Sequence, residues 1–201
     1  MEDVYQTIGK ESQGFFKDKG SKFYSFAYSV RNEDEVKEIL TRLRKEHHSA
    51  RHHCYAWRLG TEEITFRAND DGEPSSTGGK PILGQLQSFN VTNTLIVVVR
   101  YFGGTLLGVS GLINAYRNAA ADALKNAEIK QKTVEREIII DFTYNELAEV
   151  MNMIKHENLT VIYTRFEERC NLAFSVRKSE MNRVIAIFNN IYGVSVKNET
   201  S

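Results

Sequence analysis

The chain has 201 residues, of which 41% are hydrophobic and 26% charged, a composition typical of globular proteins and not of disordered ones. Its 26 Lys and Arg residues equal its 26 Asp and Glu residues, with 17 against 16 up to Lys130 and 9 against 10 after it. This balance excludes a protein that grips duplex DNA by bulk electrostatics, so any contact with nucleic acid needs a local basic patch. The longest apolar run, 95–99, is far too short for a membrane span, and the charged start MEDVYQTIGKESQG has no apolar core of a signal peptide. Because the only two cysteines, Cys54 and Cys170, lie in different halves, we expect a cytoplasmic protein without a disulfide framework.

The first 130 residues predict strands and helices in mixed order. Residues 14–30 are aromatic and partly alternating, as in strands. Apolar residues then recur at helical spacing from Val36 to Leu43, with Asn32 as the N-cap and Glu35 completing a capping box. The further elements are strands at 51–60 and 63–70 with a turn at Gly60, a short helix from Pro81, a buried strand at 94–102 and an alanine-rich helix around 112–123.

The pattern restarts after the polar stretch IKQKT (129–133). We expect a strand at 134–142, a helix through 147–154, a hairpin of 161–166 with 170–176, a helix capped by Ser179 and a final strand at 193–196. This β-α-β-β-α-β order is the split ferredoxin-like plan. The sequence therefore predicts an α+β protein of two domains, residues 1–130 and residues 134–201.

Two glycine-rich loops invite comparison with nucleotide-binding signatures. In GEPSSTGGKP (72–81), Pro81 stands where a Walker A loop needs its Ser or Thr, and Pro74 stands where it needs its first glycine. In YFGGTLLGVSG (101–111), Thr105 takes the place of the second glycine of a dinucleotide fingerprint. Neither a P-loop NTPase nor an NAD site is expected.

Both loops nevertheless run into the start of a helix, where free backbone N–H groups and the helix dipole favour an anion. Glycine lets such a backbone approach a ligand closely, and hydroxyls and cations add further contacts. The alternative is that these residues only form turns and caps. The candidate anion-binding or nucleic-acid-binding residues are Ser75, Ser76, Thr77, Gly78, Gly79, Lys80, Arg100, Gly103, Gly104 and Arg117.

Two clusters could bind metal. Asp70, Asp71 and Glu73 could hold Mg²⁺, although Asp residues in such a run more often bond their own backbone in a turn. The stretch HHSARHHC (47–54) contains four of the five histidines, but in a strand at most one His/Cys pair of it shares a face. We expect no metal and no cofactor.

Three blocks in order resemble the IMPACT/YigZ family: RHHCYAWRLG (51–60), DDGEPSSTGGKPIL (70–83) and VVVRYFGGTLLGVSGLINAY (97–116). The later domain is similar to the C-terminal domain of bacterial YigZ members, so the resemblance covers nearly the whole chain. The chain departs from the family pattern at Ser76 and Gly78, where the family loop has Gly and Ala, and at Val109 and Ser110, where it has Thr and Gly.

The resemblance implies a first domain similar to a small-subunit ribosomal protein domain and to domain four of elongation factor G. It implies a second domain similar to domain five of that factor. Eukaryotic relatives regulate translation by binding a partner that activates a stress kinase, and they use an additional N-terminal domain for which this chain has no room.

Our leading hypothesis is a non-catalytic cytoplasmic binding protein of translation, which contacts RNA, a ribosome-associated partner or a small phosphate-bearing ligand through the two glycine loops. One rival is a metal-dependent enzyme that uses Asp70, Asp71 and Glu73 on a phosphorylated substrate. Another is a protein-docking regulator. The sequence leaves the oligomeric state open.

Overall fold

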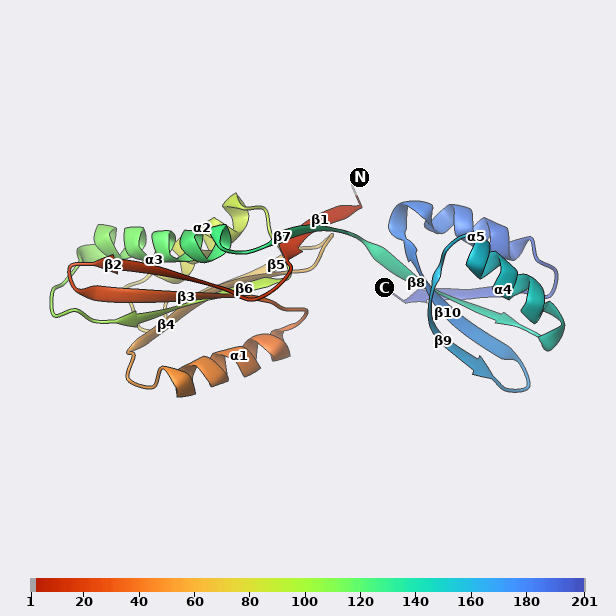
Figure 1. The fold of residues 1–201 in the computed structure, drawn as a ribbon, viewed down its shortest axis with the longest axis horizontal. Helices are drawn as coiled ribbons and strands as arrows, with labels where there is room; N and C mark the ends of the chain where they lie inside the picture. The colour runs from red at the N-terminus through yellow and green to blue at the C-terminus, as the bar shows by residue number, and fades with distance from the viewer. Residues whose placement is uncertain (1–2, 201) are drawn as a thin grey trace. The chain divides into compact units, whose positions relative to one another are not determined.

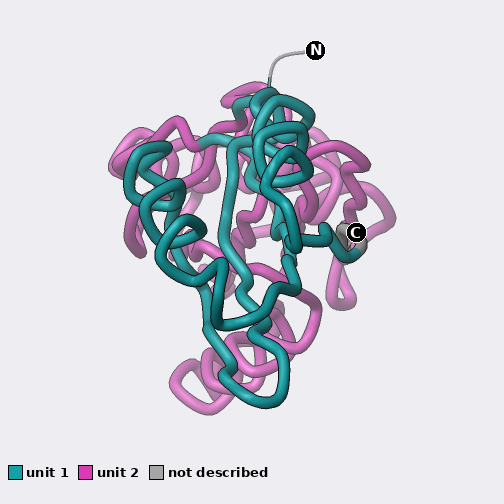
Figure 2. Tube along the Cα trace, turned by 90° about the vertical axis from the view of Figure 1, so that its right-hand side faces the viewer, with its two compact units in different colours: residues 1–4, 133–201 teal, residues 5–132 magenta. Residues whose placement is uncertain are grey.

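The computed structural model describes the chain from residue 3 to residue 200, and its side chains as far as Lys197. The chain divides into two compact units (Figure 2). Residues 5–132 form the N-terminal unit, and Asp3 and Val4 group with the residues from 133 onward in the C-terminal unit. The architecture is α+β, as the sequence predicts.

Two strands form a ribbon at the points in the sequence where the chain passes from one unit to the other. They are β1 (Val4–Ile8) and β7 (Ile129–Thr133), which pair as a two-stranded sheet. The stretch IKQKT, which we expected to be only a polar boundary, is therefore a strand. Its first four residues are exposed, so it shows no alternation of apolar and polar residues that would identify it as a strand.

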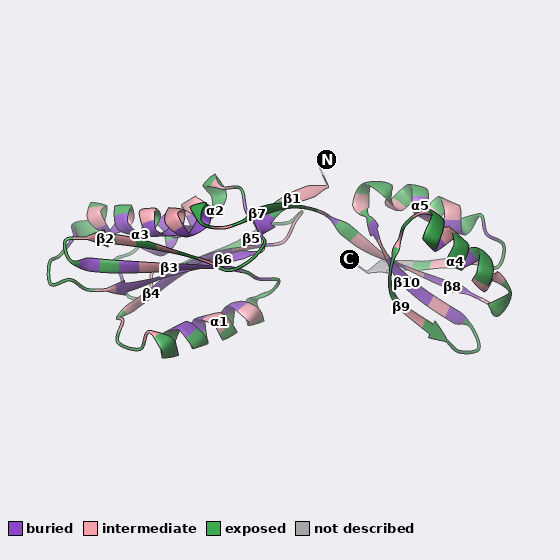
Figure 3. Ribbon diagram, viewed as in Figure 1, coloured by how far each residue is buried: buried purple, intermediate pink, exposed green. Residues whose placement is uncertain are grey.

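The N-terminal unit is built on an antiparallel five-stranded sheet in the order β2-β3-β6-β4-β5. Residues 14–30 contain most of two of these strands, which turn at Lys19 and Gly20 with positive φ of 43° and 83°, as tight hairpin turns require. The central strands β3 and β6 are largely buried (Figure 3). The strands are β2 (Ser12–Asp18), β3 (Ser21–Ser29), β4 (His52–Leu59), β5 (Thr65–Asn69) and β6 (Thr94–Tyr101).

Helices cover both faces of this sheet. On one face α1 (Glu33–Glu46) packs through Val36, Leu40 and Leu43 onto a core that includes Trp57. On the other face lie α2 (Gly79–Ser88) and α3 (Gly108–Lys125), whose alanines let α3 pack closely (Figure 1). The ends of β6, β4 and α3 thus meet the two glycine loops at one end of the sheet.

The start of α1 confirms the predicted cap. Asn32 Oδ1 accepts hydrogen bonds from the amides of Asp34 (3.1 Å) and Glu35 (3.0 Å). The Glu35 carboxylate accepts from the amide of Arg31 at 2.9 Å instead of that of Asn32, so the capping box is shifted by one residue.

The C-terminal unit has a four-stranded antiparallel sheet in the order β11-β8-β10-β9, with α4 and α5 packed on one face. Ser179 does not cap α5, because it lies inside a 3₁₀ turn, Lys178–Glu180, and its amide donates to Asp3 Oδ2 at 3.2 Å. No helix within residues 3–200 has the length and apolarity that a membrane span needs. The elements are β8 (Glu135–Phe142), α4 (Leu147–His156), β9 (Thr160–Phe166), β10 (Cys170–Arg177), α5 (Met181–Asn189) and β11 (Ser195–Thr200).

Candidate ligand-binding site

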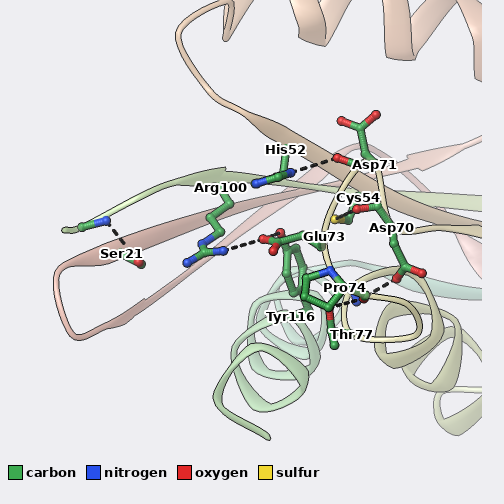
Figure 4. Close-up of polar contacts among 12 residues, drawn as sticks. Ser21, His52, Cys54, Asp70, Asp71, Glu73, Pro74, Thr77, Arg100 and Tyr116 are labelled. Atoms are coloured by element: carbon green, nitrogen blue, oxygen red, sulfur yellow. Dashed lines mark hydrogen bonds and ion pairs between the residues drawn. The ribbon is translucent and has the colours of Figure 1, made fainter. Parts of the chain in front are cut away.

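The carboxylate of Asp70 organises the first glycine loop. Its Oδ1 accepts from the amides of Gly78 (2.9 Å) and Gly79 (2.8 Å), and its Oδ2 accepts from the amide of Ser76 (2.8 Å). The amides of Gly78 and Gly79 are the N–H groups at the start of α2 that the sequence predicts to face a ligand. They bind an anion, but that anion is a side chain of the protein itself (Figure 4).

The glycines of this loop serve close packing. A Cβ on Gly78 would lie 2.6 Å from the Cys54 sulfur, and one on Gly79 would lie 2.4 Å from the Asn69 nitrogen. Ser76 holds a φ of 63°, a conformation that favours glycine. The hydroxyl of Thr77 donates to the carbonyl of Pro74 at 2.6 Å and closes the turn.

A buried ion pair lies beneath the loop. Arg100 Nη1 donates to Glu73 Oε1 at 2.6 Å, and the Tyr116 hydroxyl donates to the same oxygen at 2.7 Å. All three residues are buried, and Arg100 Nε has no hydrogen-bond partner among the described residues. Burial raises the pKa of the Tyr116 hydroxyl and of the Cys54 thiol far above their ordinary values, so both stay protonated near neutral pH. The charge of Arg100 is therefore balanced inside the protein, and Cys54 is not a thiolate nucleophile.

A cavity of about 520 Å³ lies on one side of the first loop and brings the two glycine loops together. Near the start of β4, Arg51 and His52 give the cavity a cationic and a polar group. The His52 Nδ1 atom lies 2.9 Å from the carbonyl oxygen of Asp71. Because a carbonyl only accepts, this nitrogen carries a proton in the hydrogen bond. The cavity is lined by Arg51, His52, Glu73, Pro74, Arg100, Phe102, Leu106, Leu107, Gly108, Val109 and Leu112.

A second cavity, of about 370 Å³, lies on the other side of the same loop. Its cations are Lys80, from the first turn of α2, and Arg117, from α3. Both side chains are exposed, and neither forms an ion pair with the side chains of residues 3–197. The lining residues are Ser76, Lys80, Pro81, Gly84, Gln85, Ile113 and Arg117.

The second glycine loop packs against the β2–β3 hairpin. A Cβ on Gly103 would lie 1.9 Å from the carbonyl carbon of Gly20, and the Gly103 amide donates to Ser21 Oγ at 3.1 Å. Gly104 has open space around it and a φ of 88°. The first of these glycines is thus needed for packing and the second for the turn.

The three acidic candidates each have a partner of their own. Asp70 holds the loop amides and Glu73 pairs with Arg100, while Asp71 pairs with Arg44 at 3.0 Å and accepts from the amide of His53 at 2.7 Å. No group of three His, Cys, Asp or Glu side chains in the described part of the chain is placed to hold a metal ion.

The structure thus divides the ten anion-site candidates. Ser76, Lys80 and Arg117 line one cavity and Arg100 lines the other, while Thr77, Gly78 and Gly79 are buried in the turn and Gly103 packs on the hairpin. Ser75 and Gly104 are exposed and line neither cavity. The residues that sequence reasoning missed are Arg51 and His52. His52 pairs with Arg100 across β4 and β6, so a correct sheet register would have placed it beside that side chain.

Comparisons with known proteins agree with this architecture. Residues 19–124 match the model of a family described as the Impact N-terminal domain. A Haemophilus influenzae protein named IMPACT family member is 34% identical over 161 residues, 79% of this chain and 78% of that protein. IMPACT family member YvyE of Bacillus subtilis is 29% identical over 178 residues, 89% of this chain and 82% of that protein. A crystal structure described as that of a hypothetical protein is 26% identical and has a TM-score of 0.76, covering 98% of this chain and 97% of its own.

Proposed function

Because this chain belongs to the IMPACT family, we propose that it is a non-catalytic binding protein linked to translation, which takes RNA or another phosphate-bearing ligand on its N-terminal unit. One observation carries the proposal. Residues of the first glycine loop line two cavities, and each cavity holds exposed cations: Arg51 in one, and Lys80 with Arg117 in the other.

The local charge supports an anionic ligand although the whole chain has no net charge. The acidic groups of the loop all have partners within the protein: Asp71 pairs with Arg44, Glu73 pairs with Arg100, and three amides donate to Asp70. Of the cavity cations, Arg100 is paired with Glu73, whereas Arg51, Lys80 and Arg117 form no ion pair with the described side chains. These three charges favour a phosphate near the loop.

The contacts in this proposal are side-chain cations and not loop amides. Because Asp70 already occupies the amides, a phosphate would be held by point charges and hydroxyls on either side of the loop. Such contacts fix a backbone without reading a base sequence, which suits a protein that recognises a class of RNA by position and shape.

The C-terminal unit fits the same proposal. We assign it a ferredoxin-like fold akin to domain five of elongation factor G, because its elements follow a β-α-β-β-α-β order and its strands lie in the order β11-β8-β10-β9. We propose that the whole protein has two domains, residues 1–130 and residues 134–201, and that it acts in the cytoplasm.

A protein-docking role is the second candidate, and the exposed apolar rim of the second loop favours it. Leu106 and Val109 are 82% and 59% exposed beside the larger cavity. Contiguous exposed apolar side chains of this kind often mark an interaction site. This role predicts that Leu106→Ser abolishes capture of a ribosome-associated protein while leaving RNA affinity unchanged.

The test is the affinity for a fluorescently labelled RNA measured by anisotropy, with inorganic phosphate as a competitor. Arg51→Gln, Lys80→Gln and Arg117→Gln should each weaken binding about threefold to tenfold, and the triple variant should lose most of it. Lys125→Gln, at the end of α3 and outside both cavities, is the matched control. A wild type that binds neither RNA nor inorganic phosphate, or a triple variant that binds RNA like the control, would refute the proposal, whereas binding of phosphate without RNA would assign the site to a small ligand.

A further inference from the structure

The β2–β3 hairpin carries a row of positive charges near its turn, at the end of the five-stranded sheet where β6 ends. Lys17 of β2 lies directly opposite Lys22 of β3, and Lys22 in turn lies opposite Tyr101 of β6. The hairpin segment 17–22 reads KDKGSK, with three lysines against one aspartate. Like charges directly opposite each other destabilise a sheet, so this arrangement serves something other than stability.

Aromatic rings lie beside this row on the same face. Phe15 lies opposite Tyr24, with ring centroids 5.0 Å apart, and the Tyr24 ring meets that of Tyr101 edge-on at 5.8 Å. The end of α1 supplies His47, whose Nδ1 lies 2.8 Å from the Tyr101 hydroxyl. The hairpin reaches past this end of α1, so the helix leaves part of the face uncovered (Figure 1).

These side chains surround a cavity of about 450 Å³ lined by Gly20, Lys22, Tyr24, His47, Tyr101 and Phe102. Phe15 and Phe102 are 45% and 48% exposed, unusual values for phenylalanine. Phe102 also lines the 520 Å³ cavity on the other face of the sheet, so one exposed ring borders both. The aromatic surface is therefore adjacent to the cations of the proposed phosphate site.

We infer that this end of the sheet binds an unpaired nucleotide of RNA, with its base stacked on the aromatic side chains and its phosphate beside Lys17 and Lys22. The inference rests on the proposed function and narrows it to single-stranded RNA. Exposed aromatic rings offer a stacking surface that every base can use, and the neighbouring lysines match the charge of the backbone. A duplex cannot use this surface, because its base faces are already stacked.

The experiment compares a labelled single-stranded RNA with a duplex of the same sequence by anisotropy. The wild type should bind the single strand about tenfold more tightly. Phe15→Leu and Lys22→Gln should each weaken single-strand binding about fivefold to tenfold, and Lys22→Gln should also raise the midpoint of thermal unfolding by about 2 °C, because it removes the repulsion from Lys17. The controls are Phe66→Leu, an exposed ring on the far edge strand β5, and Lys125→Gln.

Each outcome of this experiment either supports or refutes the inference. Selective loss in the two variants with unchanged controls supports the inference. RNA binding that is equally strong for the duplex, or unchanged in both variants, overturns the inference and leaves the proposed function standing. No RNA binding by the wild type also overturns the inference, and it refutes the proposed function if inorganic phosphate does not bind either.

Discussion

The carboxylate of Asp70 should be a main determinant of the stability of the N-terminal unit, since it accepts three backbone hydrogen bonds from the first glycine loop. Asp70→Ala leaves the buried amides of Gly78 and Gly79 without an acceptor, and each unsatisfied buried donor costs about 1–3 kcal/mol. The exposed amide of Ser76 can turn to water at little cost. We therefore expect a loss of about 2–5 kcal/mol, a large part of the ~5–15 kcal/mol that stabilises a typical domain.

Asp70→Asn separates the hydrogen bonds from the charge. The amide oxygen can still accept from Gly78 and Gly79, while its NH₂ group faces the Ser76 donor, so we expect a loss of about 1–2 kcal/mol. The single tryptophan of the chain, Trp57, is buried in the N-terminal unit, so its fluorescence during urea denaturation reports on this unit alone. A loss below about 0.5 kcal/mol for Asp70→Ala, or equal losses for both variants, would refute this reasoning.

Three further predictions use the same fluorescence assay. Ser76→Gly should stabilise the N-terminal unit by about 1 kcal/mol, because glycine adopts the φ of 63° without strain, and no gain would contradict the role given to this turn. Glu73→Ala should cost about 3–5 kcal/mol by leaving the buried charge of Arg100 without its partner, and the double variant with Arg100→Met should recover part of the loss. Burial lowers the pKa of His53, so below the unfolded value of about 6.5 the unfolded state takes up a proton that the folded state resists. Stability should therefore fall as the pH drops from 7.5 to 5.5, and His53→Gln should flatten this slope; an unchanged slope would mean that other groups cause it.

The elements with a strong internal pattern were predictable from the sequence. The apolar stripe of α1 and its cap at Asn32 depend on neighbours within one turn, and the structure confirms both. Five consecutive apolar residues, 95–99, predict the buried strand β6. Local patterns of this kind need no knowledge of the rest of the chain.

The failures come from partners distant in sequence. Ser179 looks like a cap, but its turn is fixed by Asp3, at the other end of the chain. The strand β7 exists because it pairs with β1, and no alternation reveals that pairing. Neither contact can be seen within a window of neighbouring residues.

For the candidate site, the sequence predicts local structure but not the surroundings. Both glycine loops open onto helices as predicted, and the structure adds that residues of both loops line one cavity. Asp70 is a candidate Mg²⁺ ligand from the sequence, whereas its carboxylate in the structure accepts hydrogen bonds from the loop amides that suggested an anion site. Whether an acidic side chain faces a ligand or the backbone depends on where its oxygens point, which residue types alone do not specify.

The salt dependence of RNA binding tests the central claim most directly. If Arg51, Lys80 and Arg117 neutralise phosphates, the logarithm of the affinity should fall against the logarithm of salt concentration with a slope that is steeper by about 2 in the wild type than in the triple Gln variant, since each phosphate contact on a single strand contributes about −0.7. Equal slopes for the two proteins would show that these cations do not contact phosphate and would contradict the account.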